Sequence, residues 1–364
     1  MSSAPRPRRV RIEQRLARRG GVVELLRAPA ALFAVAARAR AACYDAGWLV
    51  PEELDAAVVS VGNLSAGGTG KTPMAIWVAE RLAARGRRVG LLSRGYGSRP
   101  GVPNDEARVI ARRLPDVPHE QARERAEGGR RLVASGVDVV VLDDGFQHRR
   151  LARDLDLVLL DATRPFGLGP PPGGGAPVRA LLPRGLLREP PRALARAHAV
   201  VLTRVDQAET GALEALEREA RSLAPGAVFA RARHVPVRLV SSASEPARAP
   251  ESLRGASVDL VSGIAHPEAF ERTVEGLGAR VVSHRVFPDH HDYGPADLRG
   301  LGAREVVTTA KDAVKLDGLG VATWTLEVEL AVVHGEEALE RLLAGLPEAR
   351  AQRERAGLHE GLHG

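Results

Sequence analysis

The pattern of apolar and polar positions predicts strands and helices in alternation along most of the chain. Val58, Val59 and Val61 form a β-branched run that is typical of a buried strand. A glycine-rich turn follows this run, and a helix is predicted from about Thr72. Later segments predict strands at residues 89–93, 137–142, 155–161 and 199–203, and helices at 105–114 and 210–223. Such alternation is typical of an α/β domain.

A second α/β series follows residues 234–255, a segment rich in proline and serine that predicts a domain boundary. This series predicts strands at residues 258–262, 281–287, 305–309 and 322–330, and helices at 267–277, 295–301 and 338–346. We therefore predict four parts: a basic segment with a helix (1–50), a first α/β domain (51–234), a second α/β domain (235–331), and a helix with a polar tail (332–364).

The N-terminal part is basic, with seven arginines and one acidic residue among residues 1–20. Residues 1–10 are predicted to be a disordered tail. Apolar residues recur at roughly helical spacing in residues 22–49, but the longest uncharged run, Ala28–Ala37, is too short to span a bilayer. Two interpretations stay open: the helix lies on an anionic membrane surface, or it packs on the protein's own core.

Composition limits the class of protein. A chain of 364 residues is long enough for two domains, and its net charge of +7 favours acidic partners such as nucleic acid, anionic lipid or nucleotide. Cys43 is the only cysteine, so no disulfide can form within the chain, and a reducing cytoplasm is expected.

The strongest chemical motif is a phosphate-binding loop between the first predicted strand and its helix. It resembles G-x-x-x-x-G-K-[ST], with Ser65 at the position of the first glycine. Backbone N–H groups of such a loop bind phosphates, Lys71 reaches the β- and γ-phosphates, and Thr72 binds Mg²⁺. The alternative is a glycine-rich turn that merely precedes a helix. The predicted nucleotide-binding residues are Ser65, Ala66, Gly67, Gly68, Thr69, Gly70, Lys71 and Thr72.

Acidic residues at two other places are candidates for metal binding or proton transfer. Asp143 and Asp144 end an apolar strand, the pattern of a carboxylate that holds the Mg²⁺ of a bound nucleotide. Asp105 and Glu106 open a predicted helix, where acids are usually caps or partners of the helix dipole.

Three further motifs have a functional interpretation beside an ordinary one. Arg179, Arg184 and Arg188 lie in a Pro/Gly-rich stretch that is either a plain surface loop or a phosphate-binding loop. Residues 203–206 read TRVD and resemble the [NT]-K-x-D element with which GTPases recognise guanine. His290 and His291 are adjacent, point in different directions and are not expected to bind one metal together.

Taken in order, the motifs are more specific than any one of them. The segments VGNLSAGGTGKTP, SRGYG, NDEA, DDGFQH, LPRGLLREP and FPDHHDYG resemble the tetraacyldisaccharide 4′-kinase family from about residue 22 to about residue 346. The resemblance implies that the γ-phosphate of ATP is transferred, with Mg²⁺, to the 4′-hydroxyl of a tetraacyldisaccharide 1-phosphate, giving lipid IVA. It also implies a site of action at the cytoplasmic face of the bacterial inner membrane. The implied partners are an acylated disaccharide lipid and the anionic membrane surface, with no nucleic acid, and the protein is expected to be a monomer.

The resemblance also implies a fold. It predicts a P-loop NTPase-like α/β/α domain and a second, smaller α/β/α domain, together with an N-terminal membrane-associated helix. A two-stranded linker joins the domains, here at residues 234–240 and 324–330.

The family's motifs imply roles for individual residues. Asp105 is the expected catalytic base, paired with His290 or His291 and most readily with His290, while Lys71 binds phosphate. Thr72, Asp143, Asp144 and Glu106 are the expected contacts of Mg²⁺. The expected substrate contacts are Arg94, Tyr96, Gln147, His148, Arg184, Arg188 and Glu189.

The chain departs from the family's pattern at three positions. Asn104 and Ala107 flank the two acids where the family has G-D-E-P, and Ala310 stands where the family usually has glutamate in T-E-K-D-A-V-K. Two rival functions remain: a nucleotide switch such as a GTPase metal chaperone, and a membrane scaffold without catalytic activity.

Overall fold

The computed structural model describes residues 8–95, 104–169, 171 and 174–348. The chain divides into two compact units. Among the described residues, the large unit comprises residues 16–95, 110–233 and 332–348, apart from positions 170, 172 and 173. The small unit comprises residues 8–15, 104–109 and 234–331. Residues 104–109 therefore group with the small unit, although they lie within the predicted first domain.

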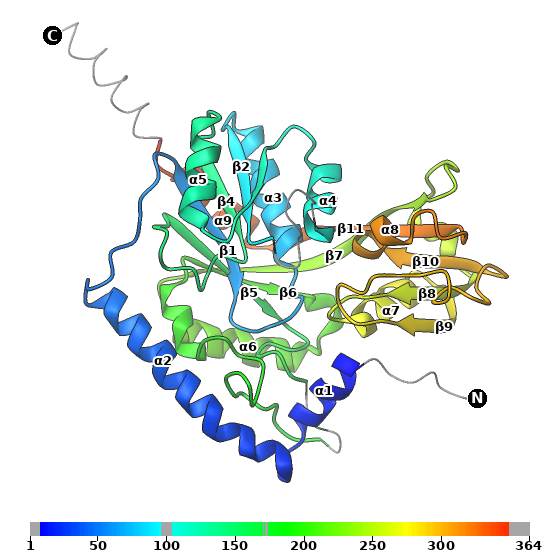
Figure 1. Ribbon diagram of the computed structural model, residues 1–364, viewed down its shortest axis with the longest axis horizontal. Helices are drawn as coiled ribbons and strands as arrows, with labels where there is room; N and C mark the ends of the chain where they lie inside the picture. The colour runs from blue at the N-terminus through cyan, green and yellow to red at the C-terminus, as the bar shows by residue number, and fades with distance from the viewer. Residues whose placement is uncertain (1–7, 96–103, 170, 172–173, 349–364) are drawn as a thin grey trace, which may run out of the picture. The chain divides into compact units, whose positions relative to one another are not determined.

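The large unit is built on a parallel sheet with the strand order β3-β2-β4-β1-β5-β6-β7 (Figure 1). All seven residues of β1 are buried, as expected for a β-branched strand in the centre of a sheet. The strands are β1 (Ala57–Asn63), β2 (Val89–Ser93), β3 (His119–Gln121), β4 (Val139–Asp143), β5 (Leu155–Asp161), β6 (Ala199–Thr203) and the first part of β7 (Val228–Ser241).

Helices α5 and α6 cover the same face of this sheet, because the strand residues that they contact are in register with one another. One apolar cluster joins the sheet to α6 and contains Phe146, Leu160 and Leu216. A second cluster joins it to α5 and contains Leu92, Leu132 and Leu142. The helices are α3 (Lys71–Ala84), α5 (Arg125–Ala134), α6 (Thr210–Leu223) and α9 (Glu336–Ala344), with the 3-10 turns η2 (Pro191–Arg196) and η3 (Val205–Gln207).

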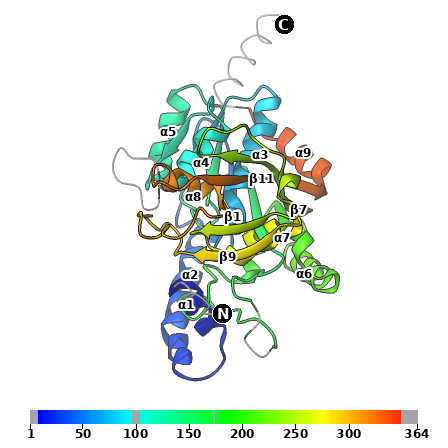
Figure 2. The same cartoon turned by 90° about the vertical axis from the view of Figure 1, so that its right-hand side faces the viewer.

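The small unit has its own parallel strands in the order β11-β10-β8-β9, so that β9 is the end strand, which both views show (Figures 1 and 2). Its strands are β8 (Ser257–Ser262), β9 (Arg280–Val286), β10 (Glu305–Thr309) and β11 (Thr323–His334), and its helices are α7 (Pro267–Gly276), α8 (Ala310–Leu316) and the 3-10 turn η4 (Pro250–Leu253). The predicted linker strands, residues 234–240 and 324–330, lie within β7 and β11.

One predicted helix of the small unit is wrong. Residues 295–300 form turns, and no helix is assigned to residues 295–301. A carboxylate oxygen of Asp297 accepts a hydrogen bond from the Gly294 N–H at 2.9 Å. Gly300 and Gly302 have φ angles of 75° and 102°. Such local side-chain bonds and left-handed glycines favour turns over a helix.

The N-terminal part contains α1 (Arg8–Ala17), η1 (Val22–Leu26) and α2 (Arg27–Asp45). Residues 1–7 of the predicted disordered tail lie outside the described residues, whereas residues 8–10 already belong to α1, contrary to the prediction. Only Ala30 of α2 is buried, so this helix is not part of the core. None of the described helices is long and apolar enough to cross a bilayer.

Candidate active site

The phosphate-binding loop connects β1 to α3, as the sequence predicts. Gly70 takes a left-handed conformation (φ 91°) as the residue before the helix, and Lys71 is the first residue of α3. This φ angle is one that glycine adopts without the penalty of a Cβ. The Lys71 ammonium lies 3.4 Å from the carbonyl oxygen of Gly67 and 3.6 Å from a carboxylate oxygen of Asp144. The lysine therefore points across the loop and towards the end of β4.

A hydroxyl and a carboxylate meet where a nucleotide-bound metal is expected. The Thr72 hydroxyl donates to Asp143 Oδ2 at 2.7 Å, and Asp143 is buried at the end of β4. Mg²⁺ prefers oxygen ligands, and in nucleotide sites it takes only one or two of them from the protein. Thr72 and Asp143 form such a pair of oxygen donors, so these residues fit the ion.

Asp144 occupies a strained position beside this pair. Its φ angle of 59° is uncommon for a residue with a side chain. Arg188 Nη1 donates to both carboxylate oxygens at 2.8 Å. Burial acts to raise the pKa of Asp144, but the charges of Lys71 and Arg188 outweigh this effect and lower the pKa to about 2. The carboxylate is therefore ionised at neutral pH and balances two cations.

The second candidate centre, in the small unit, begins with Asp105 at the start of α4 (Asp105–Arg113). The ordinary role expected for a residue near a helix N-terminus is that of a cap. Here the side chain of Asn104 caps the helix, because its Oδ1 accepts a hydrogen bond from the Ala107 N–H at 3.0 Å. The Asp105 side chain is thus not needed as the cap.

Asp105 instead contacts two groups from distant parts of the chain. His290 Nδ1 lies 3.4 Å from Asp105 Oδ2, and Lys315 Nζ lies 3.0 Å from the same oxygen. Burial acts to raise the pKa of Asp105, but the hydrogen bond with His290 and the charge of Lys315 lower it from 3.8 to about 2. All three residues belong to the small unit, so the pair forms within one unit, although Asp105 lies within the predicted first domain.

The two adjacent histidines have different surroundings. His290 has a left-handed backbone (φ 63°) and faces Asp105. His291 stacks on Phe287 with ring centroids 4.7 Å apart, and its Nε2 lies 3.0 Å from Asp297 Oδ2. The geometry thus distinguishes the two candidates, since among the described residues His290 contacts Asp105 and His291 contacts Asp297.

Glu106 and the other ring nitrogen of His290 face a second lysine. Lys311 Nζ lies 2.8 Å from Asp289 Oδ1, 3.5 Å from His290 Nε2 and 3.8 Å from Glu106 Oε1. An ionised Asp105 only accepts, and an ammonium only donates, so this environment fits the His290 tautomer with its proton on Nδ1. Glu106 was predicted to contact Mg²⁺; within the small unit its recorded partner is Lys311.

The predicted substrate contacts lie in several places. Gln147 donates to the carbonyl oxygen of Asn63 at 2.8 Å and lies 3.3 Å from Arg188 Nη1, so it neighbours the phosphate loop and Asp144. His148 is half-buried, and burial together with Arg125 and Arg40 lowers its pKa to about 4. Arg94 is exposed at the end of β2. Tyr96 lies outside the described residues, and Glu189 forms a 2.7 Å ion pair with Arg196.

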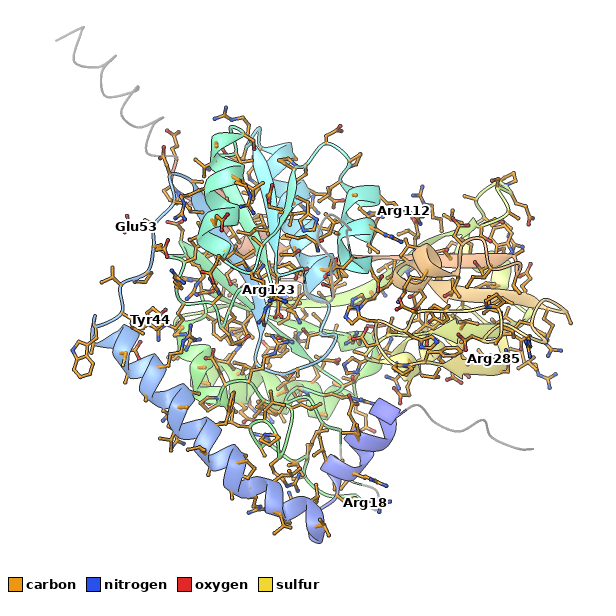
Figure 3. The ribbon with its side chains drawn as sticks, viewed as in Figure 1. Arg18, Tyr44, Glu53, Arg112, Arg123 and Arg285 are labelled. Atoms are coloured by element: carbon orange, nitrogen blue, oxygen red, sulfur yellow. The ribbon has the colours of Figure 1, made fainter. Side chains whose placement is uncertain are left out.

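The position of Arg184 does not support its predicted contact with substrate. The side chain is 2% exposed. Its guanidinium donates to the carbonyl oxygens of Leu16 (2.6 Å) and Arg18 (2.9 Å) and to Glu24 (2.7 Å). Figure 3 shows Arg18 at the turn that joins α1 to the following segment. Arg184 therefore fastens the N-terminal segment because its donors are engaged there.

Three residues at these centres were not predicted as site residues. Arg125 is 3% exposed and donates to the carbonyl oxygen of Asp143 at 3.3 Å, which places a cation beside the two aspartates. Lys311 and Lys315 stand in the segment TAKDAVK, which follows a strand end. Two sequence features could have indicated the lysines as site residues. They follow the carboxyl end of β10, and their spacing of four residues places them on one face of a helix. No local pattern marks Arg125.

The family model described as tetraacyldisaccharide-1-P 4′-kinase matches residues 22–347. The chain belongs to this family. A tetraacyldisaccharide 4′-kinase of Anaeromyxobacter dehalogenans (strain 2CP-C) is 45% identical over 341 residues, which cover 86% of this chain and 87% of the relative. One from Alkalilimnicola ehrlichii is 40% identical over 318 residues, or 84% and 87% of the two chains.

A solved structure is similar as well. The crystal structure of LpxK from Aquifex aeolicus, in complex with ATP, superposes with a TM-score of 0.68 at 29% identity and covers 89% of this chain and 99% of that chain. Together with the family match, this similarity confirms the predicted α/β fold class, the kinase class and the use of ATP. The family activity, phosphorylation of the 4′-hydroxyl of a tetraacyldisaccharide 1-phosphate, is the activity predicted from the motifs. The interpretations as a GTPase switch or a scaffold are not supported.

Proposed function

We propose that Asp105 is the base of this 4′-kinase reaction, that His290 orients it, and that the loop of residues 65–72 holds the phosphates of ATP. The observation that carries the proposal is the contact of Asp105 with His290, at 3.4 Å and 185 residues apart in sequence. A contact between side chains so distant in sequence is unexpected for two residues without a shared role. The ordinary capping role of Asp105 is already filled by Asn104.

The ionisation of Asp105 supports the role of a base. A pKa of about 2 keeps the carboxylate ionised at neutral pH, so it accepts the proton of the sugar hydroxyl. Such a carboxylate is a weak base, and in phosphoryl transfer it contributes by positioning the hydroxyl as well as by accepting its proton. His290 holds the carboxylate through Nδ1, and Lys315 keeps it ionised.

The phosphate side is assigned to the large unit. Lys71 would bind phosphate oxygens, in place of its present contact with Asp144. Thr72 and Asp143 would hold Mg²⁺, with Asp144 beside them. When bound, Mg²⁺ neutralises negative charge on the phosphate oxygens. Arg188 orients Asp144 by donating to its carboxylate. Arg125 orients Asp143 by donating to its carbonyl oxygen.

The membrane surface is the proposed place of action, at the cytoplasmic face of the inner membrane, where an acylated substrate resides. Support comes from the exposed apolar side chains of Leu32, Phe33 and Val35 on α2, which are 73%, 39% and 60% exposed. Arginines at positions 27, 38 and 40 of the same helix would favour an anionic surface.

The direct test is an ATP-dependent phosphorylation assay on a tetraacyldisaccharide 1-phosphate. Asp105→Asn is expected to lower kcat by a factor on the order of 10²–10⁴, the usual contribution of a positioned base. Lys71→Ala is expected to abolish turnover with an unchanged circular dichroism spectrum. Asp116→Asn, an exposed aspartate in the turn after α4, is the matched control. Normal turnover by Asp105→Asn would refute the assignment of the base.

A further inference from the structure

Arg204, the residue directly after β6, has a backbone conformation that costs energy. Its φ angle is 55°, in the left-handed region, which is disfavoured for a residue with a side chain. Such conformations persist where surrounding contacts hold them, and they cluster at functional sites. The contacts of the Arg204 side chain should therefore indicate which function this backbone conformation serves.

The guanidinium of Arg204 joins the phosphate loop to a buried acid. Nη1 forms an ion pair with Asp161, which ends β5 and is fully buried. Nη2 donates to the carbonyl oxygen of Gly68 at 2.9 Å. The Arg204 side chain is itself 12% exposed, so the ion pair and the hydrogen bond are both largely shielded from water.

The preceding residue makes a parallel contact. The Thr203 hydroxyl donates to the carbonyl oxygen of Thr69 at 3.0 Å. Asn63 Nδ2 donates to the hydroxyl oxygen of the Thr69 side chain at 2.9 Å. Two consecutive residues at the end of β6 thus hold two consecutive carbonyl groups of the phosphate loop, those of Gly68 and Thr69.

Holding a carbonyl group also directs an N–H group. A trans peptide is planar, and its C=O and the following N–H point in opposite directions. The bond to the Thr69 carbonyl therefore turns the Gly70 N–H away from β6. The bond to the Gly68 carbonyl fixes the plane that carries the Thr69 N–H, which donates to the Gly67 carbonyl oxygen at 3.2 Å and so holds the bend of the loop. Backbone N–H groups directed inward are what a phosphate loop offers to an anion.

We infer that Arg204 and Thr203 are positioning residues for ATP, which hold the peptide groups of Gly68 and Thr69 in the orientation that binds phosphate. This role replaces the recognition of guanine suggested by the similarity of TRVD to a GTPase element, because the Arg204 guanidinium is directed to Asp161 and the phosphate loop. The inference goes beyond the proposed roles of Lys71 and Asp105. It concerns ATP affinity and leaves recognition of the disaccharide unchanged.

Two measurements on the full-length protein test the inference: the Kd for MgATP by calorimetry, which requires no turnover, and the KM for tetraacyldisaccharide 1-phosphate. Thr203→Val removes a neutral hydrogen bond and is expected to raise the Kd about 3- to 10-fold. Arg204→Met removes a charge-assisted bond and is expected to raise it roughly 10- to 100-fold. Arg204→Lys should recover part of the loss. The KM for the disaccharide should stay within about twofold in each variant.

Arg231→Met is the matched control, since Arg231 lies on the neighbouring strand β7 at the position paired with Leu202 and forms an ion pair with Glu217. Its Kd for MgATP should equal that of the wild type. Arg204→Met removes the ion pair between Arg204 and the buried Asp161, so this variant can fail to fold. In that case Thr203→Val tests the inference, because it changes no charge. A wild-type Kd for Thr203→Val, or equal losses for ATP and disaccharide, would overturn the inference. Loss of turnover with a normal Kd for MgATP in both variants would also overturn it, since the two residues would then act on the reaction and not on ATP binding.

Discussion

At the scale of single residues, three of the four described non-glycine residues with a left-handed φ angle have ionisable side chains, and the fourth is Ser244. Asp144, Arg204 and His290 have φ angles of 59°, 55° and 63°. Each is held by a charged or hydrogen-bonded partner: Arg188 for Asp144, Asp161 for Arg204, and Asp105 for His290. Backbone strain of this kind needs such compensation. Residues that carry it without serving the fold's core are therefore good candidates for function.

The first prediction at this scale concerns Asp105 and His290 as one unit. If His290 acts by orienting Asp105, the kcat of the double variant Asp105→Ala/His290→Ala should be little lower than that of the worse single variant. Each single change should cost on the order of 10²–10⁴ in kcat, with little change in the KM for ATP. Steady-state kinetics of the three variants provides the measurement.

His291→Ala serves as the control for this cycle, since His291 contacts Asp297 and Phe287. Its kcat should stay near that of the wild type. Multiplicative losses in the double variant would contradict the pairing, and a greater loss at His291 than at His290 would assign the partner role to His291.

The second prediction concerns pH and stability. Because the pKa of Asp105 is lowered from 3.8 to about 2 in the folded protein, its stabilising effect is complete above pH 4 and disappears as the pH falls towards 2. The wild type should exceed Asp105→Asn in free energy of unfolding by about 2 kcal/mol at pH 7, and this difference should shrink between pH 4 and pH 2. Denaturant unfolding at several pH values measures it, and a constant difference would show that another interaction is responsible.

At the scale of elements, α2 is fastened at both ends to loops that carry site residues. Near its start, Arg184 holds the turn of residues 16–24. Near its end, which Figure 3 marks at Tyr44, the guanidinium of Arg149 lies 4.9 Å from the ring centroid and donates to Asp45 at 2.8 Å. Its only buried residue is Ala30, in the first turn of the helix. A helix so held keeps its position without being part of the core.

The prediction at this scale is that Arg184→Met releases the N-terminal turn. The free energy of unfolding should fall by about 2 kcal/mol, since a buried guanidinium loses hydrogen bonds to two carbonyl oxygens. Trypsin should cleave after Arg18 or Arg19 much faster than in the wild type. Arg179→Met is the control, because Arg179 precedes the same motif but is 45% exposed. Equal cleavage rates in both variants would argue against the anchoring role.

At the scale of the whole molecule, the two units, each with its own set of parallel strands, carry separate parts of the chemistry. The large unit holds the phosphate loop and the aspartates, and the small unit holds Asp105, His290 and two lysines. In each unit the polar groups follow the carboxyl ends of strands, where open α/β sheets bind ligands. Helix α2 adds an exposed apolar surface to the large unit.

The prediction for the whole molecule is that α2 mediates membrane binding. Replacing Leu32, Phe33 and Val35 by serine should weaken binding to vesicles of phosphatidylglycerol roughly tenfold or more, because the apolar area available for burial is lost. Binding of the wild type should also weaken at high salt, which screens arginine charges. Vesicle sedimentation gives the measurement.

Replacing these three side chains tests α2 alone. A deletion of residues 1–40 would also remove the hydrogen-bond partners of Arg184. Val333→Ser, at a residue 51% exposed on β11, is the control and should bind as the wild type does. Unchanged sedimentation of the triple variant would refute the role of α2.

The sequence by itself determined most elements and the motifs that carry the chemistry. Strands 89–93, 155–161, 199–203 and 305–309 and the helix of residues 210–223 have the predicted bounds. These segments are specified by local periodicity, which the chain shows residue by residue. The failed helix of residues 295–301 shows the limit of this rule, because a side-chain bond to the backbone competed with the helix.

The tertiary structure alone decided which charged side chains meet. Arg184 and Leu16 are 168 residues apart, and Arg184 was expected to contact substrate, whereas its buried guanidinium donates to the Leu16 carbonyl oxygen. Lys315 contacts Asp105 from a helix 210 positions along the chain, and Arg204 holds Gly68 from the end of another strand. No spacing rule encodes such contacts, because they depend on how strands from distant segments are ordered in each sheet and on which buried charges must find a partner.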